Sequence, residues 1–359
     1  GVLFTDAHAV PLCTPTRVSL MTGKYNFRNW MAFGILDPNA KTFGHWMQDA
    51  GYKTCIVGKW QLHSYNPVHY EPEWRSKGMR VEDAGFDEYA LFHTGHDEDK
   101  GSRYPDPVID VNGKLLENNK GLYGPDYSVE YMNDFMERHR DEPFFVYYPM
   151  ALVHDPIQPT PDSPEWKTDR FENNRKFFGD MVEYMDKLVG QVLAKIDALG
   201  IAENTLVLFY GDNGTVRGIP SKMADGTTII GGKGDPNIYG SHVPLVVRWP
   251  GMAKAGYMVE DLVDSNDFVP TILEAAGVSL PKGEIFDGVS FLPQVKGEVG
   301  NPREWIFMHY NPLPGDRKVR FRKWRWAQDK RWKLSEETGY LFDHTIDPLE
   351  TSPIMAGEG

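Results

Sequence analysis

A cysteine stands near the start of the chain, between apolar residues and a Pro-Thr-Arg turn, in the stretch AVPLCTPTR. The chain has 2 cysteines, Cys13 and Cys55, which are too few for a disulfide framework. A lone cysteine is most often a small buried hydrophobic residue. It can also be a nucleophile, but no spacing typical of a Cys-His-Asn enzyme surrounds Cys13. A third interpretation depends on its neighbours Pro15 and Arg17 and on the rest of the chain.

Other reactive side chains follow apolar segments that have the pattern of strands. Lys59 follows CIVG, His154 follows MALV, and Asp212 and Asn213 follow LVLFYG. In parallel sheets, binding and catalytic residues gather at the carboxyl ends of the strands. Three segments that end in this way indicate an enzyme.

These residues need elements to position them, and strand and helix patterns alternate along most of the chain. The expected helices are residues 41–50, 175–199 and 266–277, and the expected strands are 52–58, 143–154, 204–214 and 242–251. This alternation predicts an α/β fold with a mostly parallel sheet flanked by helices. After residue 297 short strand patterns predict a small antiparallel subdomain. We therefore expect a catalytic domain in 1–297 and a C-terminal subdomain in 298–359.

Composition excludes some classes of protein. The formal net charge is −13, and a protein that binds nucleic acid along a whole face is usually basic, so we expect no nucleic-acid partner. No run of 18 or more apolar residues occurs, so we expect no transmembrane segment. The opening GVLFTDAHAV has the pattern of a domain interior, which suggests that the chain is truncated at its amino terminus and that any signal peptide lies outside it.

The motif Cys13-x-Pro15-x-Arg17, followed by VSLMTGKY, resembles the signature of the sulfatase family in the alkaline-phosphatase-like superfamily. Five later segments are similar to further motifs of that family, in family order and over nearly the whole chain. They are GKWQLH at 58–63, ALVHDPIQP at 151–159, FYGDNG at 209–214, GGKG through HVPLVVRWPG at 231–251, and YLFDHTIDPLET at 340–351. The resemblance implies an alkaline-phosphatase-like fold and a sulfuric ester hydrolase of arylsulfatase type.

The resemblance also implies a chemical role for Cys13. A maturation enzyme oxidises it to 3-oxoalanine, called formylglycine, and the hydrated aldehyde attacks the sulfur of the ester. Its second hydroxyl then lets the adduct collapse and release sulfate, which a serine could not do. Because a sulfate ester is an anion, cationic groups that neutralise its oxygens lower the barrier to attack.

Several residues match family positions with catalytic roles. Arg17 lies one helical turn after Cys13 and is expected to hold the hydrate. Lys59 and Lys233 are expected to contact sulfate as compact positive charges. The glycines on both sides of Lys233 permit a close approach to a ligand. His154 is the expected general acid for the leaving oxygen.

The expected metal ligands are Asp212, Asn213 and the modified side chain of Cys13. Oxygen ligands suit Ca²⁺, with Mg²⁺ as the alternative, although Asp-Asn-Gly is also a common turn. The family carries a further Asp-Asp pair on its first strand, and this chain starts after that point. The remaining ligands would hold a cation poorly, because Ca²⁺ takes about six to eight oxygens.

The second motif departs from the family pattern. The family has histidine where this chain has Gln61, and glutamine cannot shuttle a proton near neutral pH. His63 is two residues away and would share a face with Gln61 on a strand. We expect both residues to bind substrate and the handling of protons to be altered.

The substrate is expected to be a sulfated small molecule or glycan, with a carbohydrate favoured. A loop at 93–106 and the aromatic residues Tyr70, Trp74 and Tyr104 could line a sugar site. Two alternatives stay open: a phosphonate monoester hydrolase or phosphodiesterase with the same formylglycine, and a degenerate, non-catalytic binder of sulfated glycans. The resemblance implies a periplasmic or secreted protein.

Overall fold

The structure is a computed structural model that describes residues 1–64, 74–95, 100–311 and 323–354. Tyr70 and part of the loop expected at 93–106 lie outside these ranges. The chain divides into two compact units. The first combines residues 1–33 with 203–359, and the second consists of residues 34–202.

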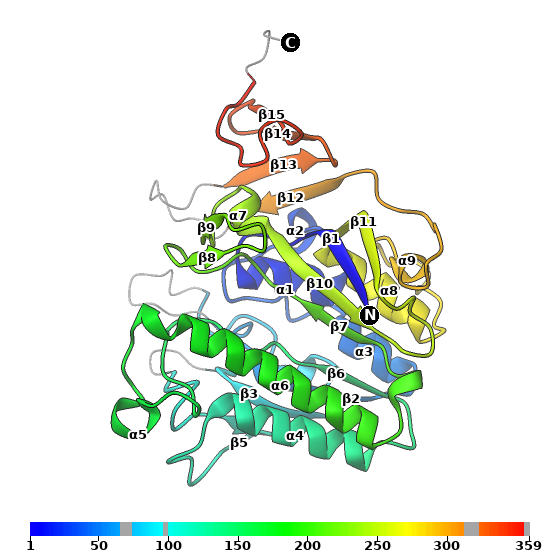
Figure 1. Ribbon diagram of the computed structural model, residues 1–359. Coiled ribbons are helices and arrows are strands. Elements are labelled where there is room, and N and C mark those ends of the chain that lie inside the picture. Colours follow the sequence, from blue (N-terminus) through cyan, green and yellow to red (C-terminus); the bar gives the residue numbers. More distant parts are fainter. Residues whose placement is uncertain (65–73, 96–99, 312–322, 355–359) are drawn as a thin grey trace. The chain divides into compact units, whose positions relative to one another are not determined.

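The first unit is built on a four-stranded sheet with the order β11-β1-β10-β7 (Figure 1). Its strands are β1 (Val2–His8), β7 (Val207–Tyr210), β10 (His242–Arg248) and β11 (Tyr257–Asp264). Strand β1 is parallel to β11 and antiparallel to β10, which is antiparallel to β7. The accompanying elements are α1 (Cys13–Thr22), α2 (Asn26–Asn29), α7 (Ile238–Ser241), α8 (Phe268–Ala275), α9 (Leu292–Val295) and the hairpin β8 (Pro220–Lys222) with β9 (Thr228–Ile230).

A second sheet of the first unit is formed by the C-terminal residues. It is antiparallel throughout, in the order β12 (Ile306–Tyr310), β13 (Trp324–Gln328), β14 (Trp332–Ser335) and β15 (Leu341–Asp343). Its buried face joins a hydrophobic cluster with residues of the first sheet and the segment before α1. The buried members are Val10, Leu262, Ile306, Met308, Tyr310 and Trp326. The expected C-terminal antiparallel sheet is therefore confirmed.

The second unit is built on a five-stranded sheet with the order β5-β4-β3-β2-β6. The strands are β2 (Lys53–Lys59), β3 (Glu88–Phe92), β4 (Asp110–Val111), β5 (Lys114–Leu115) and β6 (Phe144–Tyr147), and the helices are α3 (Phe43–Asp49), α4 (Gly124–Arg138), α5 (Trp166–Asp169) and α6 (Phe178–Ala198). Strand β2 is parallel to both neighbours, and the pairs β3–β4 and β4–β5 are antiparallel. Helices α4 and α6 lie side by side (Figure 1).

The α/β class is confirmed, but the strand directions are more mixed than expected. Strand β10 returns beside β7 after the hairpin β8–β9 and the one-turn helix α7, without a long crossover helix. Antiparallel neighbours need no crossover, so alternation of patterns alone overestimates parallel pairing. The strand expected at 143–154 ends at Tyr147. Pro149 lies just beyond it and has no N–H to offer a ladder.

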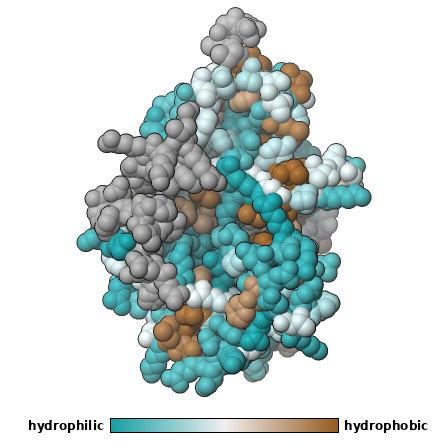
Figure 2. All heavy atoms as spheres, turned by 90° about the vertical axis from the view of Figure 1, so that its left-hand side faces the viewer, coloured by the Kyte–Doolittle hydropathy of each residue, from teal (hydrophilic) through white to brown (hydrophobic). Residues whose placement is uncertain are grey.

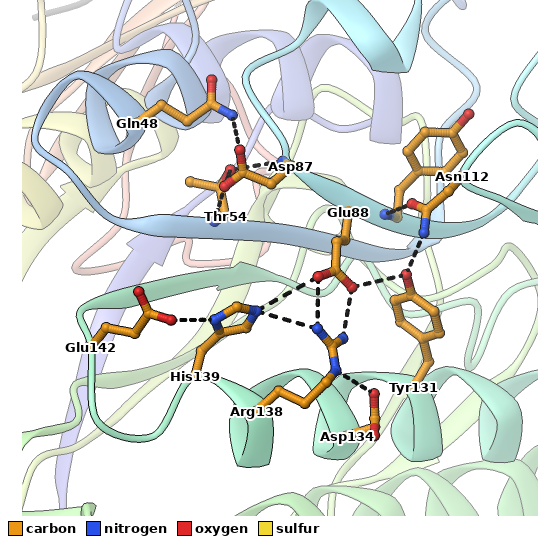
Figure 3. Close-up of polar contacts among 11 residues, drawn as sticks. Gln48, Thr54, Asp87, Glu88, Asn112, Tyr131, Asp134, Arg138, His139 and Glu142 are labelled. Atoms are coloured by element: carbon orange, nitrogen blue, oxygen red, sulfur yellow. Dashed lines mark hydrogen bonds and ion pairs between the residues drawn. The ribbon is translucent and has the colours of Figure 1, made fainter.

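Two neighbouring acidic residues, Asp87 just before β3 and Glu88 at its start, connect α3 and α4 to the sheet of the second unit (Figure 3). The Glu88 carboxylate on β3 accepts two hydrogen bonds, of 2.8 and 2.7 Å, from the guanidinium of Arg138 at the end of α4. The neighbouring Asp87 accepts hydrogen bonds of 2.8 Å from the backbone N–H of Thr54 and from the side-chain amide of Gln48. These bonds tie β3 to β2, α3 and α4.

On the face that Figure 2 shows, hydrophilic residues predominate and hydrophobic residues form small separate groups. Within the described ranges, no helix combines the length and the apolar character needed to cross a membrane.

A buried pair of acidic residues lies at the end of β11: Asp264 is the last residue of the strand, and Asp267 follows it. Asp267 forms an ion pair with Arg303, whose Nε lies 2.8 Å from both carboxylate oxygens. Asp264 is fully buried and accepts a hydrogen bond of 2.6 Å from the Ser265 N–H. Burial raises the pKa of Asp264 to about 7; the charge of Asp267 adds to the rise and that of Arg303 opposes it.

Backbone packing in the second unit depends on Gly58. It has a φ of 104°, and a Cβ at this position would lie 2.3 Å from the carbonyl oxygen of Pro149. The same carbonyl accepts a hydrogen bond of 2.9 Å from the Lys59 N–H. The absence of a side chain at Gly58 therefore allows the segment after β6 to lie directly against the end of β2.

The raised pKa of Asp264 predicts a pH dependence of stability. The unfolded chain releases this proton near the ordinary value of 3.8, whereas the folded protein keeps it to about pH 7. The contribution of Asp264 to stability therefore falls as pH rises through this window. Asp264→Asn should remove this pH dependence. Urea denaturation should therefore show that the free energy of unfolding of the original protein falls relative to that of the variant between about pH 5 and about pH 8. Asp261→Asn, on the same strand but partly exposed, is the control, and parallel curves for Asp264→Asn would contradict the prediction.

The packing at Gly58 predicts a large cost for a methyl group. Gly58→Ala should destabilise the protein by about 2 kcal/mol more than Gly51→Ala, because overpacking against backbone adds to the cost of the left-handed conformation. Gly51 is the matched control, since its φ is 84° and no atom lies within 4 Å of an added Cβ. Urea denaturation of the two variants measures the difference, and equal free energies of unfolding would show that the contact is not tight.

Candidate functional site

Cys13 is the first residue of α1 and is 3% exposed. All ten residues of α1 are buried, although half of its sequence is polar. Hydroxyl groups in the helix bond to backbone carbonyls: Thr16 to that of Val10 and Thr22 to that of Val18, both at 2.6 Å. Buried polar groups are stable when they are bonded in this way. The sulfur therefore lies in a well-packed setting rather than on a surface.

Arg17 lies four residues after Cys13 in the same helix and is 2% exposed. This spacing places both side chains on one face of α1, as expected. A guanidinium is always charged, and burying it is favourable only beside polar or anionic groups. The arrangement suits a residue that helps to hold an anion.

Three loops meet at one end of the first sheet. The register pairs His8 of β1 with His242 of β10, so the end of β1, the start of β10 and the end of β7 share this side. The N–H of Gly234 donates to the carbonyl of Pro11 at 2.9 Å, and the N–H of Lys233 donates to that of Thr215 at 2.9 Å. Backbone hydrogen bonds thus bring the Lys233 loop against the start of α1 and against the loop after β7.

The turn after β7 carries Asp212 and Asn213, which are both half-buried. The N–H of Gly214 donates to the carbonyl of Gly240 at 2.9 Å and holds the turn against α7. The side-chain amide of Asn213 donates to the carbonyl of Gly214 at 2.9 Å. Its Oδ1 is buried and accepts no hydrogen bond from the described residues. A buried acceptor in this state suits a cation ligand.

The described residues nevertheless supply only part of a metal site. Within the described ranges, no group of three or more His, Cys, Asp or Glu side chains could hold a metal ion. Asp212 and Asn213 offer oxygen donors of the kind that Ca²⁺ and Mg²⁺ prefer, but fewer than the roughly six to eight that Ca²⁺ takes.

Sequence reasoning missed the residues that hold the Lys233 loop. The Nε of Arg217 donates to the carbonyl of Lys233 at 2.9 Å, and the hydroxyl of Tyr310 on β12 donates to that of Gly234 at 3.3 Å. Lys333 on β14 donates to the carbonyl of Pro236. Two of these residues come from the C-terminal sheet, far along the chain, and no motif or spacing points to them.

Lys333 is itself an unusual residue, because it is 2% exposed. Its ammonium group lies 2.6 Å from a carboxylate oxygen of Glu350 and 4.7 Å from the ring centre of Trp326. Burial lowers the pKa of Lys333, and the charge of Glu350 opposes that change. A buried lysine with a carboxylate partner and a carbonyl acceptor fixes the backbone that it contacts.

In the second unit, Lys59 is the last residue of β2 and is 6% exposed. Its N–H bonds to the carbonyl of Pro149, and β2 pairs with β6 in parallel with Ile56 opposite Tyr147. The end of β2 and the segment after β6 therefore lie next to each other. That segment carries His154.

Gln61 and His63 do not share a strand face, because both lie beyond the end of β2. Strand β2 ends at Lys59, and Gln61 has a left-handed backbone with a φ of 47°. Its N–H donates to the carbonyl of His93 at 2.9 Å. The imidazole Nδ1 of His63 bonds instead to the carbonyl of Gly78 at 2.8 Å. The period of a strand does not apply after its last residue.

His154 comes several residues after the end of β6, so the expectation that it ends a strand is wrong. It lies in an irregular turn, and its side chain is 26% exposed. Its Nδ1 is 2.7 Å from the carbonyl oxygen of Asp155. A carbonyl only accepts, so Nδ1 carries a hydrogen and Nε2 is the nitrogen that takes up or releases a proton.

The expected site residues thus form two sets. Cys13, Arg17, Asp212, Asn213 and Lys233 belong to the first unit, and Lys59, Gln61, His63 and His154 belong to the second. Tyr104 is fully buried, so the suggestion that it stacks on a sugar is wrong.

Comparisons with known proteins agree with the sequence motifs. The family model described as Sulfatase matches residues 1–278, and a model described as N-sulphoglucosamine sulphohydrolase, C-terminal, matches residues 239–358. The chain is 27% identical over 381 residues to steryl-sulfatase of Rattus norvegicus, covering 84% of this chain and 65% of that protein. It is 26% identical over 391 residues to an ulvan-active sulfatase of Formosa agariphila, covering 99% and 70%. The chain therefore spans about two thirds of the length of these relatives.

Two solved structures are similar in fold. One is described as a complex with its substrate, D-glucosamine-2-N,6-O-disulfate; it has a TM-score of 0.72 and 20% identity, and the match covers 99% of this chain and 86% of that one. The other is a phosphonate monoester hydrolase of Agrobacterium radiobacter, with a TM-score of 0.68 and 18% identity, covering 99% and 85%. At such identities the likeness concerns the fold and does not choose between reactions.

The family follows from the extent of the match, since residues 1–278 of 359 fit one family model and include the motif at Cys13. The protein belongs to the sulfatase family.

Proposed function

We propose that this protein hydrolyses a sulfate monoester, with a sulfated carbohydrate as the natural substrate class. One observation carries the proposal: Cys13 starts a fully buried helix with Arg17 one turn later, inside the region that fits the sulfatase model. A cysteine that only packs in the core does not require a buried arginine one turn later, and an arginine on the surface would not be buried. The family generally uses a formylglycine and a divalent metal, and Cys13 is the position for the first.

Cationic side chains would neutralise the substrate. Arg17 is buried beside residue 13, and the Lys233 loop is bonded to the residues just before α1. Positive charge held in a poorly hydrated setting stabilises the oxygens of sulfate more strongly than it would in water. Lys59 takes the same role by resemblance, and its burial supports an interaction with an anion.

His154 would protonate the leaving oxygen. Its Nδ1 is engaged with the carbonyl of Asp155, which directs proton transfer to Nε2. Residue 13, once matured and hydrated, would supply the attacking hydroxyl and the second hydroxyl that permits release of sulfate. A divalent cation held in part by Asp212 and Asn213 would polarise the oxygens at sulfur.

The substrate class and the location are part of the proposal. The C-terminal model named for N-sulphoglucosamine sulphohydrolase and the disulfated glucosamine of one similar structure support a carbohydrate. We propose that residues 298–359 form a subdomain whose Tyr310 and Lys333 steady the Lys233 loop. By family resemblance the protein acts in the periplasm or outside the cell.

Maturation of Cys13 is the direct test. After co-expression with a formylglycine-generating enzyme, mass spectrometry of the peptide with residue 13 should show 3-oxoalanine, and kcat/KM for an aryl sulfate should fall by about 10³-fold or more in Cys13→Ala. Cys55→Ala is the control, because burial on β2 raises the pKa of that thiol and leaves it inert. An active protein with an unmodified thiol at position 13 would refute the mechanism.

The same preparation separates the alternatives. Faster turnover of a phosphonate monoester or phosphodiester than of the matching aryl sulfate would favour the related hydrolase. Binding of a sulfated sugar without turnover of any ester would favour a non-catalytic binder.

Gln61 predicts an altered pH profile. Gln61→His should add a titrating limb to kcat/KM between about pH 5 and about pH 8, because histidine changes charge there and glutamine does not. Histidine is among the residues that tolerate the left-handed backbone of this position. Gln61→Asn, which also tolerates that backbone, is the control without a titrating group. A profile for Gln61→His that overlays the original would show that residue 61 handles no proton.

A further inference from the structure

The turn that carries His154 is held from one side by a single buried hydroxyl. The Oη of Tyr104 lies 2.7 Å from the carbonyl oxygen of Ala151 and 2.6 Å from that of His154. The N–H of His154 also donates to the carbonyl of Ala151, at 2.9 Å. One phenol therefore spans both ends of the turn, and its hydrogen is shared between two acceptors.

Tyr104 is itself firmly held. Its side chain is 0% exposed, and its ring stacks on that of Tyr123 with the ring centres 5.9 Å apart. Its carbonyl accepts a hydrogen bond of 2.8 Å from the N–H of Gly124, the first residue of α4. The position of the hydroxyl is thus fixed by the start of a long helix rather than by a loose loop.

The hydroxyl of Tyr104 can donate a hydrogen bond over the whole working pH range, because it keeps its proton. Burial raises the pKa of Tyr104, so the phenol stays protonated throughout the working range of an enzyme. Loss of this buried donor would affect both carbonyl oxygens, that of His154 more than that of Ala151, which keeps the hydrogen bond from the His154 N–H. Removing a buried hydrogen-bond donor in this way is costly. The turn would then relax, and the imidazole with it.

We propose that Tyr104 is a positioning residue for His154: its hydroxyl fixes the backbone of the turn so that the imidazole presents Nε2 in one orientation. The catalytic part of this inference rests on the proposed function, in which His154 protonates the leaving oxygen. Tyr104 touches neither substrate nor reacting atoms and acts only through His154. A general acid contributes through geometry first, and a small displacement of its donor nitrogen weakens proton transfer.

The structure offers a matched pair of variants. Tyr104→Phe removes only the hydroxyl in question. Tyr123→Phe removes the hydroxyl of the ring stacked on it, and that hydroxyl is buried without a hydrogen-bond partner among the described residues. Both changes keep an aromatic ring of the same shape, so both variants should fold, and their thermal unfolding is measured first.

Hydrogen–deuterium exchange tests the structural part without any enzyme assay. In Tyr104→Phe the amide of His154 should exchange about tenfold faster than in the original chain, since its hydrogen bond to Ala151 then lies in a loosened turn. In Tyr123→Phe the rate should be unchanged. Equal protection of this amide in the original chain and in Tyr104→Phe would overturn the proposal, whether or not the protein is a sulfatase.

A leaving-group series tests the catalytic part. Esters of acidic nitrophenols need little protonation of the leaving oxygen, whereas phenyl sulfate needs much. In the mature chain, Tyr104→Phe should leave kcat/KM for the nitrophenyl esters nearly unchanged and lower it about tenfold for phenyl sulfate, in the same direction as His154→Ala. A uniform loss across the series would assign Tyr104 a purely structural role and overturn the proposal. Failure of the original, matured chain to hydrolyse any sulfate ester would refute the proposed function instead, and the exchange rates would still decide whether Tyr104 holds the turn.

Discussion

The first unit depends on one constraint: a helix with a charged and polar sequence, α1, is buried along its whole length. Such a helix is stable only if the residues around it supply hydrogen-bond partners for its buried polar side chains. The segment before it accepts the Thr16 hydroxyl, and the Gly234 N–H bonds to Pro11. Tyr310 and Lys333 of the C-terminal sheet donate hydrogen bonds to carbonyls of the loop that contains Gly234. Elements from both ends of the chain are thereby needed to bury Cys13 and Arg17.

In the second unit, different contacts position the candidate residues, because these residues lie at or beyond the ends of strands rather than at the start of a helix. Lys59 ends β2, and the missing side chain of Gly58 lets the Pro149 carbonyl come close enough to bond its N–H. The chain beyond β6 is irregular, so its shape comes from side chains such as Tyr104 rather than from a ladder. In both units, a few buried hydrogen-bond donors to backbone carbonyls therefore determine the positions of loop residues.

Elements with a strong repeating pattern were predictable. Helix α6 was expected at 175–199 and spans Phe178–Ala198, because apolar residues recur on one face over many turns. The backbone around Gln61 and His154 was not predictable in this way. The strand expected at 143–154 was extended past its end, and no pattern described the chain beyond Lys59. A left-handed residue at Gln61 and a proline at position 149 interrupt the period, and the backbone beyond each of them depends on partners elsewhere in the unit. Strand direction in β10 was missed for a related reason, since a pattern of apolar residues does not record which way its neighbour runs.

The sequence by itself determined the family, the long helix α6 and the types of residue available for chemistry, since these depend on local spacing and on motifs that lie along the chain. The tertiary structure alone decided which loops meet at the start of α1, which nitrogen of His154 carries the fixed hydrogen and which distant residues hold the Lys233 loop. These are contacts between residues far apart in the chain. They form only when buried polar groups find partners in the folded molecule, and no local pattern encodes that choice.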